Sequence, residues 1–587
     1  MKRWGKYIKP YLRYFIIGPI CMIIEVIGEV IMPKLLAVVI NGASAVDEAG
    51  ASAPTLTVGT SLGIMVLMIL TALMMMAGGV GGAYFGAKAS VNFATDLRAD
   101  MYRKIQKYSF ANIDRFSTGS LVTRLTNDVT QMQNFVNMLL RMALRSPGMM
   151  IAALIMAITM KPSLSVVFAV VLPLLLLTVG GIILVGFPRF TRMQEKVDGL
   201  NSTVQENVTN VRVVKSFVRE DFETNKFMKA NGELKGAGVA AMRVMIFMSP
   251  VMSLFMNVTT LTVIWLGGKT VLAGGMQIGD LSAFVTYVTQ ILSSLMMITF
   301  LLMFSARAFA SARRIREVLD EQVDLTDETA ACPDKKVERG DVTFRDVSFR
   351  YYKNSTESVL SHIDLTIPHG TTVGIIGSTG CGKTTLVSLI DRLYDADEGE
   401  VLVDGVNVKD YSLTNLRDGV GMVLQKNTLF SGTIEENLRW GDENATDEEV
   451  RLAASHAQAD KFVTDFPDGY LTKLDEGGTN VSGGQKQRLC IARALLKKPK
   501  ILILDDSTSA VDTATEKQIR KAFREELAGS TKIIIAQRIS SVMEADQIIV
   551  MNDGRITGTG THAELMEQNT EYREIYDSQM ESAKEGN

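Results

Sequence analysis

The sequence contains few cysteines and carries little net charge. The four cysteines, Cys21, Cys332, Cys381 and Cys490, lie far apart and lack the spacing of a disulfide framework or a metal site. A net charge of −3 gives no support for a nucleic-acid partner, and we expect none. The basic N-terminus precedes an apolar stretch that is too long for a cleavable signal and lacks a clean small-residue cleavage site. The function must therefore be sought in the apolar runs and in the motifs.

Hydrophobic residues make up 47% of the 587 residues, but they are unevenly spread, which predicts more than one domain. Long apolar runs occupy residues 1–310, whereas the remainder resembles an ordinary soluble α/β domain. The predicted fold class is a polytopic α-helical membrane domain followed by an α/β domain. The expected boundaries are 1–312 for the membrane domain, 313–340 for a charged linker, 341–580 for the α/β domain and 581–587 for a tail.

Six membrane spans are predicted, each near the ~20 apolar residues that a bilayer requires. They centre on residues 14–40, 60–88, 135–160, 163–187, 238–272 and 280–308. Lysine and arginine gather at alternate ends of these spans, which predicts that both termini are cytoplasmic. The segment 118–158 would be ~60 Å long as one helix, about twice the apolar thickness of a bilayer. Paired glycines at 78–79 and 81–82 favour close helix packing.

Two carboxylates lie within the first predicted span. Glu25 and Glu29 are four residues apart, so they share one helix face. Because charged groups are costly in a membrane, they usually face the bundle interior or water. The pair is a candidate site for a cationic or polar substrate, or for protons. The alternatives are a structural hydrogen-bond network, or a position of Glu29 near the outer interface. We expect Arg141 and Arg145 to extend toward the inner headgroups.

A complete phosphate-binding loop lies in the α/β domain. The residues fit G-x-x-x-x-G-K-[ST], follow a predicted strand over 372–376 and open a predicted helix over 384–390. In such loops, backbone N–H groups and the helix N-terminus bind phosphates. We expect Lys383 to reach the β and γ oxygens, and Thr384 to bind Mg²⁺. The candidate ATP-binding residues of the loop are Gly377, Ser378, Thr379, Gly380, Cys381, Gly382, Lys383, Thr384 and Thr385.

Further motifs follow in order. The apolar run 501–504 ends in Asp505 and Asp506, and the run 533–536 is followed by Gln537. Residues 481–485 read Val-Ser-Gly-Gly-Gln, and residues 509–512 read Ser-Ala-Val-Asp. Together with the phosphate loop, this arrangement resembles the ATP-binding cassette (ABC) transporter family. The six predicted spans agree with the exporter type of that family, and the α/β domain would then be a P-loop ATPase with ATP and Mg²⁺ as its ligands.

The resemblance assigns a role to each motif residue. Asp505 and Gln425 would hold Mg²⁺ with Thr384, and Tyr351 would stack on adenine; the lesser alternative is that Tyr351 is a core strand aromatic. In the family, two ATPase domains dimerise head to tail, so that each ATP lies between the phosphate loop of one chain and the signature motif of the other. The residues that would act across the dimer are Ser482, Gly484, Gln485 and Asp512.

Two catalytic positions depart from the family pattern. Asp506 stands where the family has Glu, and Gln537 stands where it has His. A carboxylate one methylene shorter has roughly 1.5 Å less reach, and a general base must lie within ~2.6–3.2 Å of its water. Glutamine can donate a hydrogen bond but cannot titrate. Both changes together resemble the degenerate-site subunit of bacterial heterodimeric exporters, so we expect poor hydrolysis at this site.

The resemblance also implies coupling segments and partners. Residues 112–115 and 214–220 are similar in position to the two segments that contact ATPase domains in exporters, and Glu476 is a weaker candidate for such a contact. The implied partner is a second half-transporter with the consensus Glu and His, in a bacterial inner or plasma membrane. The leading hypothesis is efflux of amphipathic drugs or lipids. The alternatives are a narrow substrate (lipid, peptide or metal chelate, even by import), a non-transporting regulator, and a slow homodimer.

Overall fold

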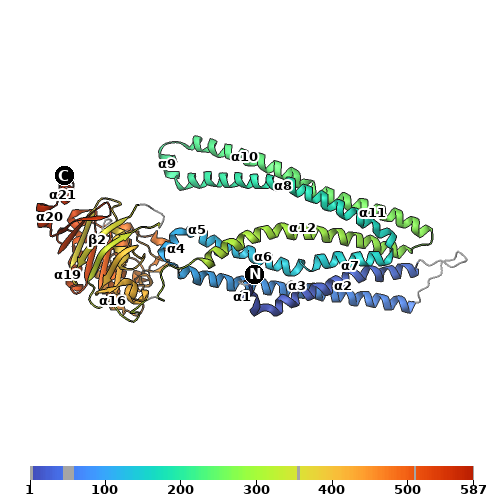
Figure 1. Ribbon diagram of the computed structural model, residues 1–587, viewed down its shortest axis with the longest axis horizontal. Helices are drawn as coiled ribbons and strands as arrows, with labels where there is room; N and C mark the ends of the chain where they lie inside the picture. The colour runs from blue at the N-terminus through green and yellow to red at the C-terminus, as the bar shows by residue number, and fades with distance from the viewer. Residues whose placement is uncertain (1–3, 44–57, 329, 353–356, 508–510, 586–587) are drawn as a thin grey trace. The chain divides into compact units, whose positions relative to one another are not determined.

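A computed structural model describes residues 4–43, 58–328, 330–352, 357–507 and 511–585. The chain divides into two compact units, drawn in Figure 1. The helical unit comprises Met1–Ile105 and Gly119–Asp320, and the α/β unit comprises Gln106–Thr118 and Glu321–Asn587. The short segment 106–118 therefore belongs with the C-terminal part of the chain.

The helical unit contains six helical segments that are long and apolar enough to cross a membrane, which confirms the predicted number of spans. They contain 39 to 53 residues each. At ~1.5 Å per residue, each is about twice as long as the apolar core of a bilayer. The elements are α1 (Gly5–Ile8), η1 (Lys9–Tyr11), α2 (Leu12–Ala43), α3 (Val58–Gln106), α5 (Thr118–Thr123), η2 (Arg124–Asp128), α6 (Val129–Met142), α7 (Arg145–Met160), α8 (Pro162–Thr209), α9 (Val211–Ser216), α10 (Glu220–Ile246), α11 (Met248–Leu272) and α12 (Ile278–Asp320).

The run that begins at Thr118 is helical, but it is not one continuous α-helix as predicted. A π-helical turn, η2, separates α5 from α6, and the chain leaves helical hydrogen bonding again between α6 and α7. Pro147 is the third residue of α7. Proline lacks an N–H group and clashes with the preceding turn, so it is tolerated in the first turn of a new helix. Pro250 occupies the same position in α11, after the break that follows α10.

The helical unit is held together by close contacts of apolar helices. In Figure 1, α8 and α10 run side by side and are joined by the short α9. The buried Tyr287 of α12 donates a hydrogen bond to the carbonyl of Val30 in α2, at 2.8 Å. A Cβ atom added at Gly78 in α3 would lie 2.8 Å from the carbonyl oxygen of Cys21 in α2. This glycine therefore permits the close approach of α2 and α3 that the paired glycines predicted.

The α/β unit contains two main sheets. The first is antiparallel, with the strand order β2-β1-β4-β5, and the second has the order β12-β11-β3-β10-β9-β6. In the second sheet all neighbours are parallel except the edge pair β11 and β12. The strands are β1 (Val342–Phe349), β2 (Leu360–Ile367), β3 (Thr372–Gly377), β4 (Glu398–Val403), β5 (Val406–Asn407), β6 (Val420–Val423), β7 (Gly432–Thr433), β8 (Lys473–Leu474), β9 (Ile501–Asp505), β10 (Thr531–Ile535), β11 (Gln547–Asn552) and β12 (Arg555–Gly560).

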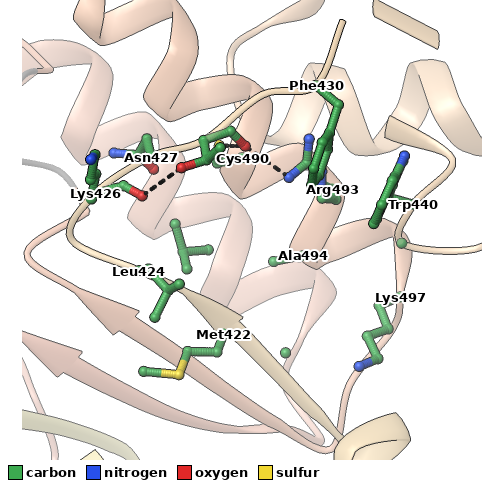
Figure 2. A pocket seen from close by; sticks show the side chains of 14 residues that line it. Met422, Leu424, Lys426, Asn427, Phe430, Trp440, Cys490, Arg493, Ala494 and Lys497 are labelled. Atoms are coloured by element: carbon green, nitrogen blue, oxygen red, sulfur yellow. Dashed lines mark hydrogen bonds between the residues drawn. The ribbon is translucent and has the colours of Figure 1, made fainter. Parts of the chain in front are cut away.

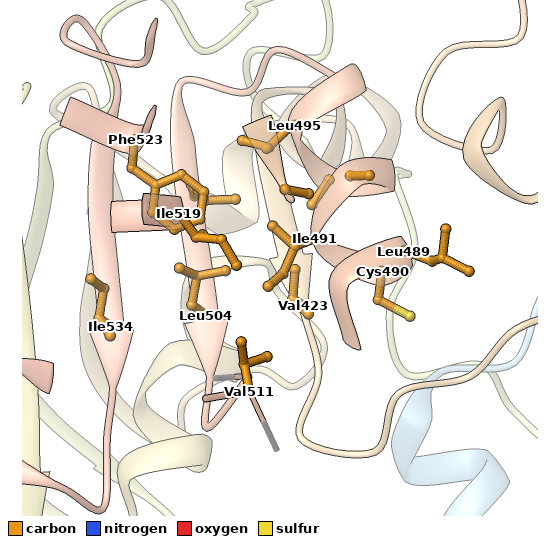
Figure 3. Packing of buried hydrophobic residues seen from close by; sticks show 14 of the residues in the cluster. Val423, Leu489, Cys490, Ile491, Leu495, Leu504, Val511, Ile519, Phe523 and Ile534 are labelled. Atoms are coloured by element: carbon orange, nitrogen blue, oxygen red, sulfur yellow. The ribbon is translucent and has the colours of Figure 1, made fainter. Parts of the chain in front are cut away.

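Helices cover the parallel sheet and bury its apolar strands. Figure 3 shows Ile491 and Leu495 of α18 and Ile519 and Phe523 of α19 packed around Leu504 of β9. All five residues of β9 are buried, as expected for a central parallel strand. The helices of this unit are α4 (Phe110–Arg115), α13 (Lys383–Ile390), α14 (Leu413–Gly419), α15 (Ile434–Leu438), α16 (Asp447–His456), α17 (Asp460–Thr464), α18 (Gly483–Leu496), α19 (Thr513–Glu526), α20 (His562–Gln568) and α21 (Thr570–Glu585); short 3-10 turns are η3 (Val408–Asp410), η4 (Gly469–Leu471), η5 (Glu476–Gly478) and η6 (Ile539–Ser541).

Candidate functional site

Four motifs that are distant in the sequence meet at one edge of the parallel sheet. The strands β3, β10, β9 and β6 are consecutive neighbours and all run in the same direction. The phosphate loop follows β3, Gln537 comes soon after β10, Asp505 ends β9, and Gln425 lies just beyond β6. Because parallel strands end at the same edge, this strand order brings the four motifs together, at the place where α/β sheets bind ligands.

The phosphate loop adopts a conformation that requires glycine. Gly380 and Gly382 have φ values of +87° and +99°, and a Cβ atom at Gly382 would lie 2.8 Å from a methyl carbon of Leu360. Gly382 precedes the first residue of α13, so the N–H groups of the first turn face the loop. The Lys383 ammonium donates to the carbonyls of Gly377 and Ser378, at 2.8 and 2.7 Å. This cradle of N–H donors and one lysine fits a chain of phosphates.

Oxygen ligands suited to Mg²⁺ lie next to the loop. The Thr384 hydroxyl donates to Asp505 Oδ2 at 2.9 Å. Burial raises the pKa of the Asp505 carboxyl above its usual value, and the hydrogen bond from Thr384 opposes that shift. A hydroxyl and a buried carboxylate at hydrogen-bond distance are hard ligands of the type that Mg²⁺ prefers. The residues present therefore fit a magnesium ion bound with a nucleotide phosphate.

Asp506 is held by the residues around it. Gln537 Nε2 donates to Asp506 Oδ2 at 2.7 Å, and Gln425 also forms a side-chain hydrogen bond to Asp506. Burial raises the pKa of the Asp506 carboxyl, and these two hydrogen bonds lower it. The buried Gln487 of α18, which no sequence pattern singled out, donates to the Asp506 carbonyl at 3.4 Å. Asp506 and Gln537, the two residues that depart from the family pattern, are thus in direct contact with each other.

Tyr351 lies just after β1, not within the strand that the sequence predicted. Its hydroxyl is 2.9 Å from the hydroxyl of Thr385 in α13. The residue is 42% exposed, and its ring packs edge-on against Phe349 and Tyr394, with centroids 5.0 and 5.2 Å apart. Tyr351 therefore stands beside the phosphate loop with part of its ring open to a ligand.

A second tyrosine, Tyr394, links this aromatic cluster to α4. Its hydroxyl donates to Asp114 Oδ2 at 2.7 Å, and its ring lies 6.1 Å from that of Phe110. Burial, and then the bond to Asp114, raise the pKa of the Tyr394 hydroxyl. The first predicted coupling segment is thus the helix α4, whose buried Asn112 also donates to the carbonyl of Gln322 at 2.9 Å. The sequence placed this segment only by topology and did not suggest Tyr394.

The signature motif, residues 481–485, forms a separate site. Ser482 caps α18, with Gln485 N donating to Ser482 Oγ at 3.3 Å and Ser482 N donating to Gln485 Oε1 at 2.9 Å. Gly484 lies in the first turn of the same helix, so backbone N–H groups are presented at its N-terminus. Asp512 caps α19 in the same way, and Ser509 and Ala510 lie outside the described residues. Across the described part of the chain, no hydrogen bond joins Ser482 or Gln485 to the phosphate loop.

An apolar groove of about 320 Å³ lies beside Gln425, and Figure 2 shows its lining. Leu424 and Lys426 line it, and Phe430 stacks on Trp440 with ring centroids 4.2 Å apart. Trp440 is 64% exposed. No local sequence pattern predicts this groove, because its walls come from β6, the segment after it and α18.

The remaining candidates occupy other places. In the second predicted coupling segment, α9 is followed by Phe217 and Val218, which are 72% and 81% exposed. Glu476 begins the turn η5.

In the helical unit, Glu25 and Glu29 both accept hydrogen bonds from Arg145, at 3.3 and 2.8 Å. The expectation that Arg145 extends to the headgroups is wrong, because its guanidinium is drawn to these carboxylates.

Comparison with known proteins agrees with this architecture. Residues 15–295 match the family described as ABC transporter transmembrane region, and residues 360–509 match the family described as ABC transporter. The chain is 37% identical to YfiB of Bacillus subtilis (strain 168), named an uncharacterised ABC transporter ATP-binding protein, over 99% of this chain and 98% of YfiB. It is 32% identical to YgaD of the same strain, provisionally named a multidrug export ATP-binding/permease protein, over 98% of both chains.

A solved structure of a bacterial Atm1-family ABC exporter with ATP bound has the same fold, with a TM-score of 0.77 and 25% identity. The match covers 97% of this chain and 98% of that structure. Similarity over almost the whole length, together with the strand order and the phosphate loop, leads to one conclusion. The chain belongs to the ABC transporter family and joins a transmembrane region of exporter fold to an ATP-binding domain.

Proposed function

We propose that this chain is one half of a heterodimeric, ATP-driven exporter, and that its own nucleotide site binds ATP and Mg²⁺ but hydrolyses ATP poorly. The observation that carries the proposal is the bond of 2.7 Å between Gln537 Nε2 and Asp506 Oδ2. This bond occupies one carboxylate oxygen of the shortened catalytic residue. A general base needs a free oxygen within ~2.6–3.2 Å of the water that it activates.

The nucleotide would be held by the phosphate loop and by Tyr351. Backbone N–H groups over residues 377–385 would bind the phosphates, Lys383 would neutralise their charge, and Tyr351 would pack against adenine. Thr384, Asp505 and Gln425 would hold Mg²⁺. When bound, the ion would neutralise charge on the β and γ phosphates.

Two features argue for slow hydrolysis at this site. Asp506 is one methylene shorter than Glu, so its carboxylate stops roughly 1.5 Å short of the water. Gln537 cannot gain or lose a proton, and it spends its amide donor on Asp506. The expected result is a site that stays occupied by ATP and stabilises a closed dimer, so that nucleotide binding shifts the population of conformations.

The signature motif, which departs from the family pattern LSGGQ only at Val481, argues for a partner with a working site. Ser482, Gly484 and Gln485 lie at the N-terminus of α18, away from their own phosphate loop. Such an N-terminus favours an anion such as a γ-phosphate. In the proposed heterodimer, these residues and Asp512 complete the partner's ATP site. The partner would carry the consensus Glu and His.

The groove in Figure 2 is the proposed receptor for a coupling segment of the partner. Its stacked Phe430 and Trp440 offer an apolar surface beside Gln425. The partner's coupling segment would place apolar side chains on this surface, as the exposed Phe217 and Val218 after α9 would do on the partner's groove. Contact at this place would pass the state of the metal-binding Gln425 to the helical domain of the partner.

The proposed boundaries are 1–312 for the membrane domain, 313–340 for the linker, 341–580 for the ATPase domain and 581–587 for the tail. The basic ends of the spans support a bacterial plasma or inner membrane location with both termini cytoplasmic. We propose amphipathic molecules as the substrates, supported by the provisional name of YgaD. A single narrow substrate, such as a lipid, peptide or metal chelate, is the alternative.

Affinity capture of this chain from its native membrane tests the heterodimer. We expect a one-to-one complex with a second half-transporter that has Glu at the position of Asp506 and His at the position of Gln537. Trapping of labelled ATP, followed by identification of the labelled chain, should then show ATP retained on this chain and ADP produced on the partner. Recovery of this chain only as a self-dimer would contradict the proposal.

A further inference from the structure

Two glutamates share a single arginine within the helical unit. Arg145 Nη2 donates to Glu29 Oε1 at 2.8 Å and to Glu25 Oε1 at 3.3 Å. Among the residues that the structure describes, neither glutamate forms a salt bridge with another basic side chain. The cluster therefore contains one more carboxylate than it has cations to balance.

The cluster lies deep in the helices. Glu25 is 13 residues from the start of α2, and Glu29 is 14 residues from its end. Arg145 is the first residue of α7, 15 residues before the end of that helix. At ~1.5 Å per residue, Glu25 lies about 20 Å from the start of α2, and Glu29 lies about 20 Å from its end. Arg145 lies about 20 Å from the end of α7. The predicted apolar span over residues 14–40 likewise has both glutamates near its middle.

Several polar atoms of the cluster are buried without partners. Glu29 Oε2, Gln290 Oε1 and Arg145 Nε have no hydrogen-bond partner among the described residues. Gln290 of α12 is fixed by its amide, which donates to the Glu29 carbonyl at 2.9 Å. Buried polar groups are normally paired, so each exception needs an explanation. A network whose only role was to hold helices together would not leave two acceptors and a net negative charge unsatisfied.

The side chains of the cluster are only partly buried, although the unpaired Glu29 Oε2, Gln290 Oε1 and Arg145 Nε are themselves buried. Those of Glu25, Glu29 and Arg145 are 19%, 23% and 30% exposed in one protomer. Gly79 of α3 faces this carboxylate, because a Cβ atom there would be in van der Waals contact, 3.5 Å from Glu25 Oε1. The surrounding residues on α2 are apolar, among them the buried Met22 and Val26. Within the described residues no set of three metal-ligating side chains forms, which argues against a metal ion as the ligand.

We propose that this cluster binds the cationic group of an amphipathic substrate, with Glu29 as the main contact and Arg145 as the residue that positions both carboxylates. The surplus charge and the free acceptors select a cation, and the apolar surroundings select an organic one. This inference rests on the proposed transport function and names its substrate class. Charge selection in a membrane interior is strong because an unpaired charge is costly there.

The test uses two ions of one shape and opposite charge. Binding of labelled tetraphenylphosphonium and of tetraphenylborate is measured on the purified complex in lipid nanodiscs, without nucleotide. We expect Glu29→Gln to weaken tetraphenylphosphonium binding by about 10-fold and to leave tetraphenylborate binding unchanged or stronger. Unchanged tetraphenylphosphonium binding, or an equal loss for both ions, would overturn the inference.

Two variants keep the test specific. Glu29→Asp retains the charge and should recover most of the binding that Glu29→Gln loses. Asp280→Asn removes a carboxylate at the start of α12, where Asp280 accepts a hydrogen bond from Asn41 at 3.2 Å, and it should bind both ions as the wild type does. Nucleotide trapping on the same preparations separates the two proposals. If Glu29→Gln changed the binding of both ions equally while ATP was still retained on this chain and hydrolysed on the partner, only the cation site would be refuted.

Discussion

The two units of the molecule use polar residues in different ways. In the α/β unit, the functional side chains follow neighbouring parallel strands, so the backbone carries them to one edge. In the helical unit, Glu25 and Arg145 are separated by 120 residues and meet only because α2 packs against α7. The first site depends on a sheet that many sequences can build. The second depends on which helix faces meet, and in the proposed exporter it is therefore where specificity for a substrate would vary.

The largest expected effect is at the phosphate loop. Lys383→Ala removes the only lysine of the loop, and each hydrogen bond between it and a phosphate contributes about 1.5–3 kcal/mol. We expect nucleotide affinity at this site to fall about 100-fold, while the complex keeps part of its ATPase activity because the partner's site remains. Equilibrium binding of a fluorescent ATP analogue measures this.

Lys498→Ala is the matched control, since Lys498 pairs with Glu449 on α16 and not with the loop. It should bind nucleotide as the wild type does. Complete loss of ATPase activity in Lys383→Ala would mean that this site is itself the catalytic one, contrary to the asymmetry that we propose.

Restoring the two departures from the family pattern should produce the next largest effect. Asp506→Glu with Gln537→His lengthens the carboxylate and frees it from the glutamine amide. General-base catalysis contributes roughly 10²–10⁴-fold, so we expect hydrolysis at this site to rise by about 10-fold or more. Single-turnover hydrolysis on this chain, with the partner's site inactivated, is the measurement. Each single variant serves as its control, and a double variant no faster than the wild type would refute the account of the degenerate site.

A smaller effect is expected from the link between Tyr351 and α4. Tyr394→Phe keeps the ring beside Tyr351 but removes the hydrogen bond to Asp114. Coupling between sites is typically about 1–3 kcal/mol, or about 5- to 150-fold, and one hydrogen bond carries part of it, so we expect substrate stimulation of ATPase activity to fall roughly 3- to 10-fold with unchanged ATP affinity. Tyr411→Phe is the control, because the buried Tyr411 hydroxyl donates to Val403 and touches no part of α4. Equal stimulation in both variants would show that the bond carries no coupling.

The smallest effect concerns stability. Burial raises the pKa of the Asp391 carboxyl to about 7, although the Arg417 and Lys497 charges lower it, and its Oδ1 has no partner among the described residues. Since the folded state binds the proton more tightly than the unfolded chain does, stability should fall as pH rises from about 4 through about 7. Asp391→Asn should abolish that decline and raise the melting temperature at pH 8 by about 2–4 °C. A wild-type melting temperature that does not depend on pH would contradict this.

Much of the α/β unit could be predicted from the sequence because its signals are local. The strand before the phosphate loop, the helix after it and the acidic end of β9 all follow from short patterns around Lys383 and Asp505. The prediction failed where a residue lies at the edge of an element, as Tyr351 does, since the pattern could not show where the strand ends. It missed Tyr394 and Trp440 because their roles arise from neighbours distant in the sequence.

The same division holds in the helical unit. Six spans follow from hydropathy. Inside a bilayer, a run of about twenty apolar residues can satisfy its backbone hydrogen bonds by forming a helix. Pro147 and Pro250 are plain in the sequence, but a hydropathy pattern does not show that a helix breaks before each of them. The partner of Glu29 could not be predicted at all, because helix periodicity gives the face of a residue and not what lies opposite.

The sequence by itself determined the membership of the family, the phosphate loop and the two substituted catalytic positions, because each is a pattern of adjacent residues. Only the tertiary structure decided that Gln537 binds Asp506, that Tyr394 joins Tyr351 to α4, and that Arg145 serves both glutamates. The physical reason is that a hydrogen bond needs its two partners within about 3 Å. Distances of that size between remote residues are set by strand order and helix packing, which no local pattern encodes.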